Sequence, residues 1–385
     1  MTDMTAAPQT DAAGTQVFGT HEVRLSGRLW VLAIALLGGA FIGMPAVWQA
    51  GEHFQPTADY RIPYALSSDY WLFGRYCRWV ASQGQTLVVG DSVTWGQYVG
   101  ADQTLPHYLN QLAGQDRFAN MGMDGMHPAA LAGLIQYYGG AISGRNVIVH
   151  CNLLWMSTKK HDLQVDKEFQ FNHPALVPQF FPRIACYRAP YPQRLSIVVQ
   201  RLVPLLGWTD HLRVAYFDQM SIPAWTIERP YGDLLKTPTR GLPGPDRGPH
   251  QEPVPWTQAG LTEQDFPWVP LDTSFQWRSF RRALETLQAR GNRLFVLVGP
   301  FNEHMLTPES LAAYVQRRDQ VAAWLDEHSI PHYVAPALPS EDYADASHPL
   351  SEGYALLAQG LFNDQAFARF DSGRAALPRP DGGVR

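Results

Sequence analysis

The sequence has few cysteines and no metal-ligand pattern, and both absences exclude classes of protein. Its 385 residues include three cysteines, Cys77, Cys151 and Cys186. An odd number this small fits neither a disulfide framework nor a zinc site. Cys77 and Cys186 could still pair in an oxidising compartment. Because no His, Asp or Glu cluster has metal-ligand spacing, we expect no metal and no cofactor.

Charge is also scarce and has no strong sign. Charged residues make up 17% of the chain, and the formal net charge is −5. No basic face points to nucleic acid and no glycine-rich motif would cradle a phosphate, so we expect no nucleic-acid partner. Hydrophobic residues make up 45% of the chain, enough for a large core, and the length allows one to three domains.

One long apolar run lies near the N-terminus. Residues 29–48 carry no charge and are enough to span a bilayer at about 1.5 Å per residue. Trp30 and Trp48 lie at its two ends, and basic residues precede it, which predicts a cytoplasmic N-terminus. We expect residues 1–28 to be a disordered cytoplasmic tail and the chain from about residue 52 to lie outside the cytoplasm. In a cell with an outer membrane that compartment is the periplasm; a cleaved signal peptide is the alternative.

After an aromatic-rich connecting segment at residues 52–83, short apolar runs alternate with amphipathic ones. The alternation predicts an α/β fold with three layers, in which helices cover both faces of a mostly parallel sheet. We expect this domain to span residues 84–365 and a flexible tail to follow at 366–385. The expected strands lie at 87–89, 117–120, 146–150, 293–298 and 332–335, and the expected helices at 104–113, 129–138, 280–290, 308–328 and 351–362.

A proline-rich segment at about residues 156–274 interrupts this pattern. Residues 174–270 hold 16 of the 30 prolines, which argues against long regular elements. Trp208 and Trp225, with two further tryptophans, argue against plain disorder. We therefore expect an irregular but ordered insertion, with residues 192–206 as its one helix.

The sequence Gly90-Asp91-Ser92 ends the first expected strand. A serine on a sharp turn between strand and helix exposes its hydroxyl beside the first backbone N–H groups of the helix. A nucleophile needs that environment, since the N–H groups can stabilise a developing oxyanion. The alternative is that Ser92 only caps a helix.

A base and its partner follow on one short loop near the end of the chain. Asp345 and His348 come after the last expected strand. In a parallel sheet that loop lies on the same edge as Ser92, so the three side chains can meet as nucleophile, base and orienting acid. Gly125 and Asn152 end the second and third strands on that edge and are candidate oxyanion donors, together with the N–H of Ser92.

Four more polar residues occur at this edge and are possible pocket residues. Asp91 has its simplest role as a brace of the nucleophile turn. His127, His150 and Asn302 either line the pocket or serve the structure alone.

These motifs, in this order, resemble those of the SGNH (GDSL-like) hydrolase superfamily. Gly90-Asp91-Ser92 resembles the nucleophile block, residues 120–125 the glycine block, and Asp345-Ala-Ser-His348 the Asp-x-x-His block. Cys151-Asn152 takes the place of Gly-x-Asn-Asp, without its glycine and second Asp. The resemblance covers roughly residues 84–155 and 275–365. It implies an SGNH (flavodoxin-like) fold, a Ser92–His348–Asp345 triad, and an oxyanion hole of Ser92, Gly125 and Asn152.

The expected function is that of a membrane-anchored serine hydrolase, an esterase or deacetylase acting on O-acylated carbohydrate or another acyl ester through an acyl-Ser92 intermediate. A single-pass SGNH domain outside the cytoplasm is also similar to accessory proteins that O-acetylate polysaccharides beside a multi-span membrane acyltransferase. That makes an O-acetyltransferase the first alternative. A lipase or lysophospholipase, and a non-catalytic assembly protein on the same fold, are the others.

Overall fold

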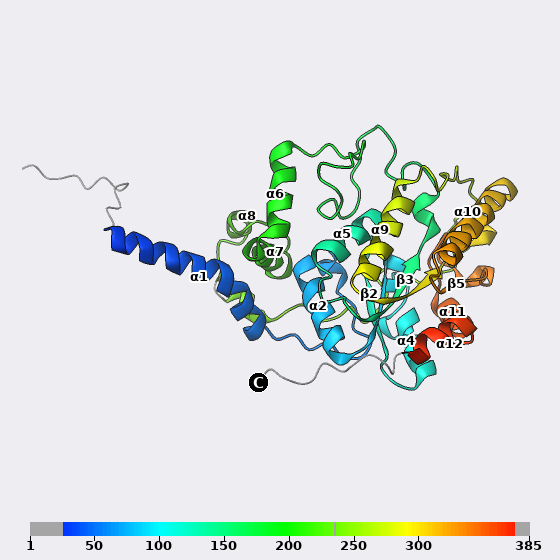
Figure 1. The fold of residues 1–385 in the computed structure, drawn as a ribbon, viewed down its shortest axis with the longest axis horizontal. Helices are drawn as coiled ribbons and strands as arrows, with labels where there is room; N and C mark the ends of the chain where they lie inside the picture. The colour runs from blue at the N-terminus through cyan, green and yellow to red at the C-terminus, as the bar shows by residue number, and fades with distance from the viewer. Residues whose placement is uncertain (1–25, 235, 374–385) are drawn as a thin grey trace, which may run out of the picture. The chain divides into compact units, whose positions relative to one another are not determined.

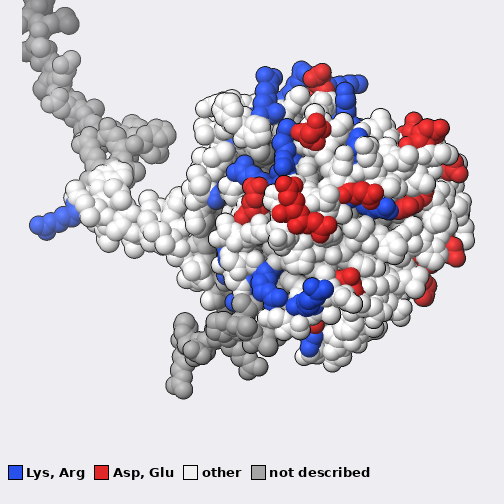
Figure 2. Space-filling model, turned by 45° about the vertical axis from the view of Figure 1, so that its right-hand side comes forward, with Lys and Arg blue, Asp and Glu red and all other residues white. Residues whose placement is uncertain are grey.

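The computed structural model describes residues 26–234 and 236–373, and the chain divides into two compact units, residues 1–49 and 50–385. In the first unit, helix α1 (Gly27–Gly51) contains the anchor predicted at residues 29–48. By length and composition it could cross a membrane, with a mean hydropathy of 2.1 over its most apolar window. Arg28 is its only charged residue, and Figure 2 shows the rest of its surface without charge. The cytoplasmic orientation of the N-terminus stays a prediction.

Five strands of the second unit form one parallel sheet in the order β2-β1-β3-β4-β5. They are β1 (Thr86–Gly90), β2 (Phe118–Gly122), β3 (Asn146–Cys151), β4 (Arg293–Val298) and β5 (His332–Val334). Val89 of β1 lies opposite both Met121 of β2 and Val149 of β3, so the carboxyl ends of the central strands share one edge. The predicted α/β class and parallel sheet are confirmed.

Helices connect these strands and cover them. They are α2 (Tyr70–Gln83), α3 (Ser92–Trp95), α4 (Leu105–Ala113), α5 (Pro128–Tyr137), α9 (Phe275–Ala289), α10 (Pro308–Glu327), α11 (Ser351–Phe362) and α12 (Gln365–Ser372). The predicted helices correspond to α4, α5, α9, α10 and α11. The short helix α3, which directly follows β1, was not separately predicted.

Alternate strand residues point to opposite faces of the sheet, and helices cover both faces (Figure 1). Leu87 and Val89 belong to a core that includes residues of α2, α5, α9 and α10. Val88 and Ile148 pack on the other face with α4, α11 and α12. Strands buried on both faces are rich in apolar residues, which is why the central strands were recognisable from the runs at 87–89, 147–149 and 294–298.

The aromatic-rich residues 52–83 are part of the globular unit and do more than connect. Tyr76 and Phe73 of α2 are buried in the core, 2% and 0% exposed. Asp69 caps α2, since its carboxylate accepts from the N–H of Leu72 at 2.9 Å. This segment belongs to the same compact unit as the sheet.

The proline-rich segment holds three helices, which corrects the expectation of irregular structure there. They are α6 (Tyr191–Leu202), α7 (Pro204–Tyr216) and α8 (Ile222–Glu228). Pro192, Pro204 and Pro223 lie in their first turns, where the missing N–H would have had no partner inside the helix. For the same reason the one helix expected at 192–206 is two helices, the second beginning at Pro204.

The C-terminal prediction was also wrong in part. Residues 366–372 belong to α12, which buries Phe367 and Phe370 to 1% and 3% exposure. Residues 374–385, like residues 1–25 of the expected cytoplasmic tail, lie outside the described residues. All three cysteines are buried and free, so Cys77 and Cys186 do not pair.

Candidate active site

Ser92 is the first residue of α3, directly after the turn that ends β1. Asp91 is the helix cap, not Ser92, because its carboxylate accepts from the N–H of Val93 at 3.1 Å. Only glycine fits at position 90, where an added Cβ would lie 2.1 Å from the Thr94 hydroxyl and 2.8 Å from His150. The tight turn leaves Ser92 7% exposed at the carboxyl edge of the sheet.

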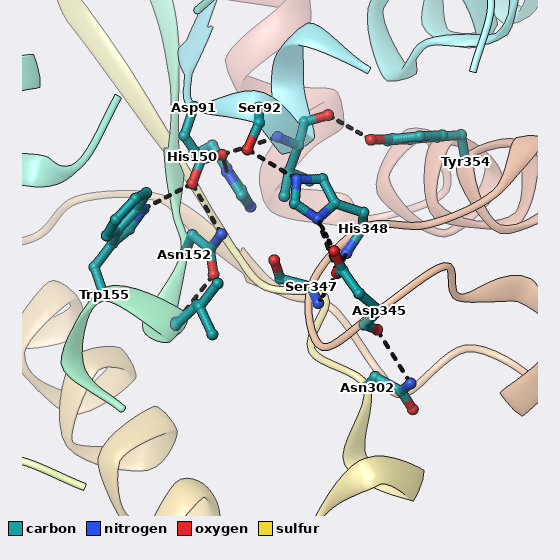
Figure 3. A network of polar contacts seen from close by, with 12 residues as sticks. Asp91, Ser92, His150, Asn152, Trp155, Asn302, Asp345, Ser347, His348 and Tyr354 are labelled. Atoms are coloured by element: carbon teal, nitrogen blue, oxygen red, sulfur yellow. Dashed lines mark hydrogen bonds and ion pairs between the residues drawn. The ribbon is translucent and has the colours of Figure 1, made fainter. Parts of the chain in front are cut away.

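The structure brings Ser92, His348 and Asp345 together across 256 residues of sequence (Figure 3). The Oγ of Ser92 lies 2.8 Å from Nε2 of His348. Nδ1 of His348 lies 2.8 Å from both carboxylate oxygens of Asp345. A Ser–His–carboxylate chain of this geometry can move a proton from the hydroxyl to the imidazole while the carboxylate fixes the tautomer.

The charges around His348 and Asp345 favour a protonated imidazole beside an ionised carboxylate. Burial by itself lowers the pKa of His348, but the nearby charge and hydrogen bond of Asp345 outweigh it, so the pKa is raised above its ordinary value. Burial raises the pKa of Asp345, but His348 and two backbone N–H groups outweigh it and the pKa is lowered. The imidazole is therefore a stronger base than a free histidine.

The loop that carries Asp345 is held by Asn302, which lies on the loop after β4. Nδ2 of Asn302 donates to the carbonyl of Asp345 at 3.1 Å, and its backbone N–H donates to the carbonyl of Ala346 at 2.9 Å. The N–H groups of Ser347 and His348 donate to Oδ1 of Asp345 at 2.9 and 3.0 Å. Asn302, a possible pocket residue in the sequence, is 0% exposed and braces the loop.

Asp91 is the centre of a buried network behind Ser92 (Figure 3). Besides the N–H of Val93, its carboxylate faces Nδ1 of His150 at 3.2 Å, Nδ2 of Asn152 at 2.8 Å and Nε1 of Trp155 at 2.8 Å. Burial would raise the pKa of Asp91, but the hydrogen bonds and charge of His150, with those of Trp155 and Asn152, lower it to about 2. The carboxylate thus stays charged and fixes the amide of Asn152.

His150 serves this network and His127 a different one. Nε2 of His150 lies 3.0 Å from the carbonyl of Gly299, so both ring nitrogens face acceptors. His127 caps α5, and its Nε2 lies 3.0 Å from the carbonyl of Asn172. Burial lowers the pKa of His127 to about 4. Both residues are at most 5% exposed and their ring nitrogens face groups of the protein, which favours the structural role for both.

Gly125 lies in a turn that only glycine fits. Its φ is +65°, and an added Cβ would lie 2.0 Å from the Asn172 amide. The neighbouring Asp124 faces the site: burial raises its pKa, opposed first by the charges of His348 and His250 and also by a backbone hydrogen bond from Gly125. A carboxylate therefore lies close to the Gly125 N–H that the sequence proposes as an oxyanion donor.

Several residues of the site were missed in the sequence. The ring of Tyr98 lies 5.3 Å from that of His348. Burial, together with the charge and hydrogen bond of Asp345, raises the pKa of Tyr98 to about 12. Asp124 lies within the glycine block at residues 120–125, and Tyr98 lies just after the Gly90-Asp91-Ser92 motif. Their closeness in sequence to these motifs could have indicated them. Trp155 lies three residues after Asn152 and could have been indicated in the same way, whereas His250 had no such signal.

Part of the proline-rich segment covers the loop after Ser92. The N–H groups of His250 and Gln251 both donate to the carbonyl of Gln97 at 3.0 Å. The ring of His250 stacks on Tyr64 with centroids 3.4 Å apart. His348, like Ser92, is nearly covered, at 6% exposure. Ser92 and His348 are thus nearly buried, and the loop after Ser92 contacts a segment that is distant in sequence.

Comparisons with known proteins name no relative. No protein-family model matches this sequence, and no curated protein matches it. Within residues 26–234 and 236–373, no group of three or more His, Cys, Asp or Glu side chains is placed to hold a metal ion.

Proposed function

We propose that this protein is a membrane-anchored serine enzyme that hydrolyses acyl esters, with O-acylated carbohydrate outside the cytoplasm as its substrate class. The observation that carries the proposal is the continuous contact from Ser92 Oγ through His348 to Asp345. The proposal includes the three-layer SGNH arrangement and a cytoplasmic N-terminus. The helices that cover both faces of the sheet support the first point. For the second point, α1 is long and apolar enough to span a membrane, and the basic residue Arg28 lies at its N-terminal end.

In the proposed reaction Ser92 attacks the ester carbonyl while His348 takes its proton. Asp345 holds the imidazole and stabilises the imidazolium. The backbone N–H of Ser92 and the second amide N–H of Asn152 stabilise the oxyanion, joined by the N–H of Gly125 once the Asp124 carboxylate has released it. His348 then returns the proton to the leaving alcohol, and an acyl-Ser92 ester remains. Finally His348 activates water, which releases the carboxylic acid and frees Ser92.

Asp91 has a positioning role in this scheme. One N–H of the Asn152 amide is held at 2.8 Å by Asp91, and its oxygen accepts from the N–H of Leu154 at 3.0 Å. With both bonds made, the carboxamide plane is fixed and its second N–H has a set direction. A donor fixed in advance needs no reorganisation when the oxyanion forms.

Acyl transfer to a sugar hydroxyl is the second candidate. The cover over the site favours it, since Ser92 and His348 are 7% and 6% exposed and excluding water protects an acyl-enzyme from hydrolysis. In that case the acyl donor is supplied at the membrane, where a multi-span acyltransferase could act as the partner.

The full chain in detergent micelles tests both candidates. We expect a fluorophosphonate probe to label the wild type and Ser82→Ala, whose serine is exposed on α2, but not Ser92→Ala. Turnover of p-nitrophenyl acetate should follow the same pattern. Mass gain on an added oligosaccharide would identify the transferase. Absence of labelling and of turnover in the wild type would refute a serine enzyme.

A further inference from the structure

Helix α6 has an exposed apolar face. None of its residues is buried. Four of its apolar side chains recur at intervals of four, four and three residues, which places them on one side of a helix. The loop before it adds Phe181, which is 91% exposed. We call these five residues the α6 apolar face: Phe181, Tyr191, Leu195, Val199 and Leu202, with the last four exposed by 66%, 44%, 40% and 72%.

Two exposed arginines lie beside this face. Residues 169–209 contain four arginines and no Asp, Glu or Lys. Two of the arginines, Arg194 and Arg201, donate to backbone carbonyls of the protein itself. Arg183 and Arg188, which flank the same loop, are exposed. A surface of aromatic and aliphatic side chains bordered by arginines is typical of protein that lies in the headgroup region of an anionic bilayer.

The chain enters the globular unit next to this region. Glu52 directly follows the last residue of α1, and Oε1 of its carboxylate is held by Nε2 of His211 at 2.9 Å and by the hydroxyl of Tyr216 at 2.5 Å. Both partners belong to α7, and α6 packs against α7 (Figure 1). If α1 spans the bilayer, Glu52 lies at the membrane surface whatever the tilt of the span, and α7 and α6 are held near it.

We propose that the α6 apolar face docks on the surface of the lipid bilayer that α1 crosses, with the exposed Arg183 and Arg188 contacting anionic headgroups. This second attachment would restrict the rotation of the globular unit about its single span. It does not depend on the proposed acyl-ester chemistry, but it rests on the membrane anchoring through α1 that the proposed function includes.

Site-specific labelling of the full chain in phospholipid vesicles tests the docking. The native cysteines are at most 1% exposed, so an introduced cysteine is the accessible thiol. Leu195→Cys and Leu202→Cys would each carry an environment-sensitive fluorophore, and vesicles would contain nitroxide-labelled lipid. The matched control is Leu356→Cys on α11, because Leu356 and Leu195 are almost equally exposed, at 43% and 44%. Helix α7 packs against α2 on one face of the sheet, whereas α11 packs on the opposite face.

We expect nitroxide lipid to reduce the fluorescence at positions 195 and 202 about twofold, because docked helices sit roughly 5–10 Å into the interface. Position 356 should be unaffected, and the reduction should be greater in vesicles with anionic lipid than in neutral ones. Lack of quenching at 195 and 202 would overturn the proposal. So would equal quenching at 356, or failure of the full chain to float with the vesicles. A blue-shifted but unquenched signal would overturn it too, by indicating contact between protein molecules.

Discussion

Replacing Asp91 by asparagine removes one buried charge while keeping the shape of the side chain. The carboxylate of Asp91 is 3% exposed and accepts from four donors. Its pKa is lowered from 3.8 to about 2. At about 1.4 kcal/mol per pKa unit, that difference corresponds to about 2.5 kcal/mol of stability held by the charged form.

The pH dependence follows from the sign of this shift. A carboxyl with a lowered pKa in the folded state stabilises the fold above its ordinary pKa near 4, and that contribution is lost as the pH falls toward 2. Asp91→Asn should therefore be less stable than the wild type by about 2.5 kcal/mol at neutral pH. The difference should shrink below about pH 4 and approach zero near pH 2.

Urea unfolding of the full chain in detergent, followed by tryptophan fluorescence over a pH series, measures this difference. The control is Asp326→Asn, since the side chain of Asp326 is 79% exposed and its replacement should have little effect at any pH. A difference for Asp91→Asn below about 0.5 kcal/mol at neutral pH, or one that stays constant down to pH 2, would refute the reasoning, because both contradict a charge held by buried donors.

Three further predictions concern the site and its support. The kcat/KM of ester hydrolysis should fall at acid pH as His348 becomes protonated, with a midpoint above the ordinary histidine pKa of 6.5. A midpoint below 6.5 would contradict a raised pKa of His348. Asp345→Asn should lower kcat by about 10⁴. Gly125→Ala should lower the free energy of unfolding by about 1–3 kcal/mol because φ is positive there, whereas Gly140→Ala has open space; thermal melts of equal midpoint would count against this. Burial lowers the pKa of His211, but the neighbouring carboxylates of Asp69 and Glu52 outweigh it and raise the pKa to about 9. The protonated imidazole therefore stabilises the fold fully below about pH 6.5, and this contribution is lost as the pH rises through 9. In urea unfolding, the loss of stability caused by His211→Gln should disappear at high pH.

The strands and the order of the site motifs could be predicted because their signals are local. The central strands contain apolar runs at residues 87–89, 147–149 and 294–298. Ser92 lies just after the first run, and His348 lies on the loop that follows the last strand. The shared edge of a parallel sheet then brings them together without further information. The same reasoning placed Gly125 at this edge, and glycine is the residue type that adopts a positive φ without steric cost.

The remaining features depend on tertiary contacts that no local pattern shows. Proline density suggested irregular structure, but a proline in a first turn begins a helix as readily as it breaks one, as Pro204 shows. α12 was missed because Phe367 and Phe370 are separated by two residues in a short polar stretch. The contact of Tyr98 with Asp345 joins residues 247 positions apart, and its hydrogen bond is visible only once the fold is known.

The segments outside the SGNH-like motifs are nevertheless part of the site. The side chain of Arg61 is 0% exposed, and its guanidinium donates to the carbonyls of Trp95 and Gly96, at 3.0 and 2.6 Å, just after the nucleophile. The same group donates to the carbonyls of Asp246 and Gly248 in the proline-rich segment, at 3.1 and 2.6 Å. One buried cation thus ties the N-terminal segment, the nucleophile loop and the proline-rich segment together.

The turn that contains Gly125 is also held by a residue of the proline-rich segment. Nε2 of His173 lies 2.6 Å from the carbonyl of Asp124, and Nδ1 lies 3.0 Å from the hydroxyl of Tyr70 in α2. Deleting the proline-rich segment would remove two of the four carbonyls that the buried Arg61 guanidinium contacts and the His173 partner of the Asp124 carbonyl. Removing partners of a buried charge is destabilising. The segment therefore cannot be a detachable lid: the loops that carry Ser92 and Gly125 need it to keep their positions.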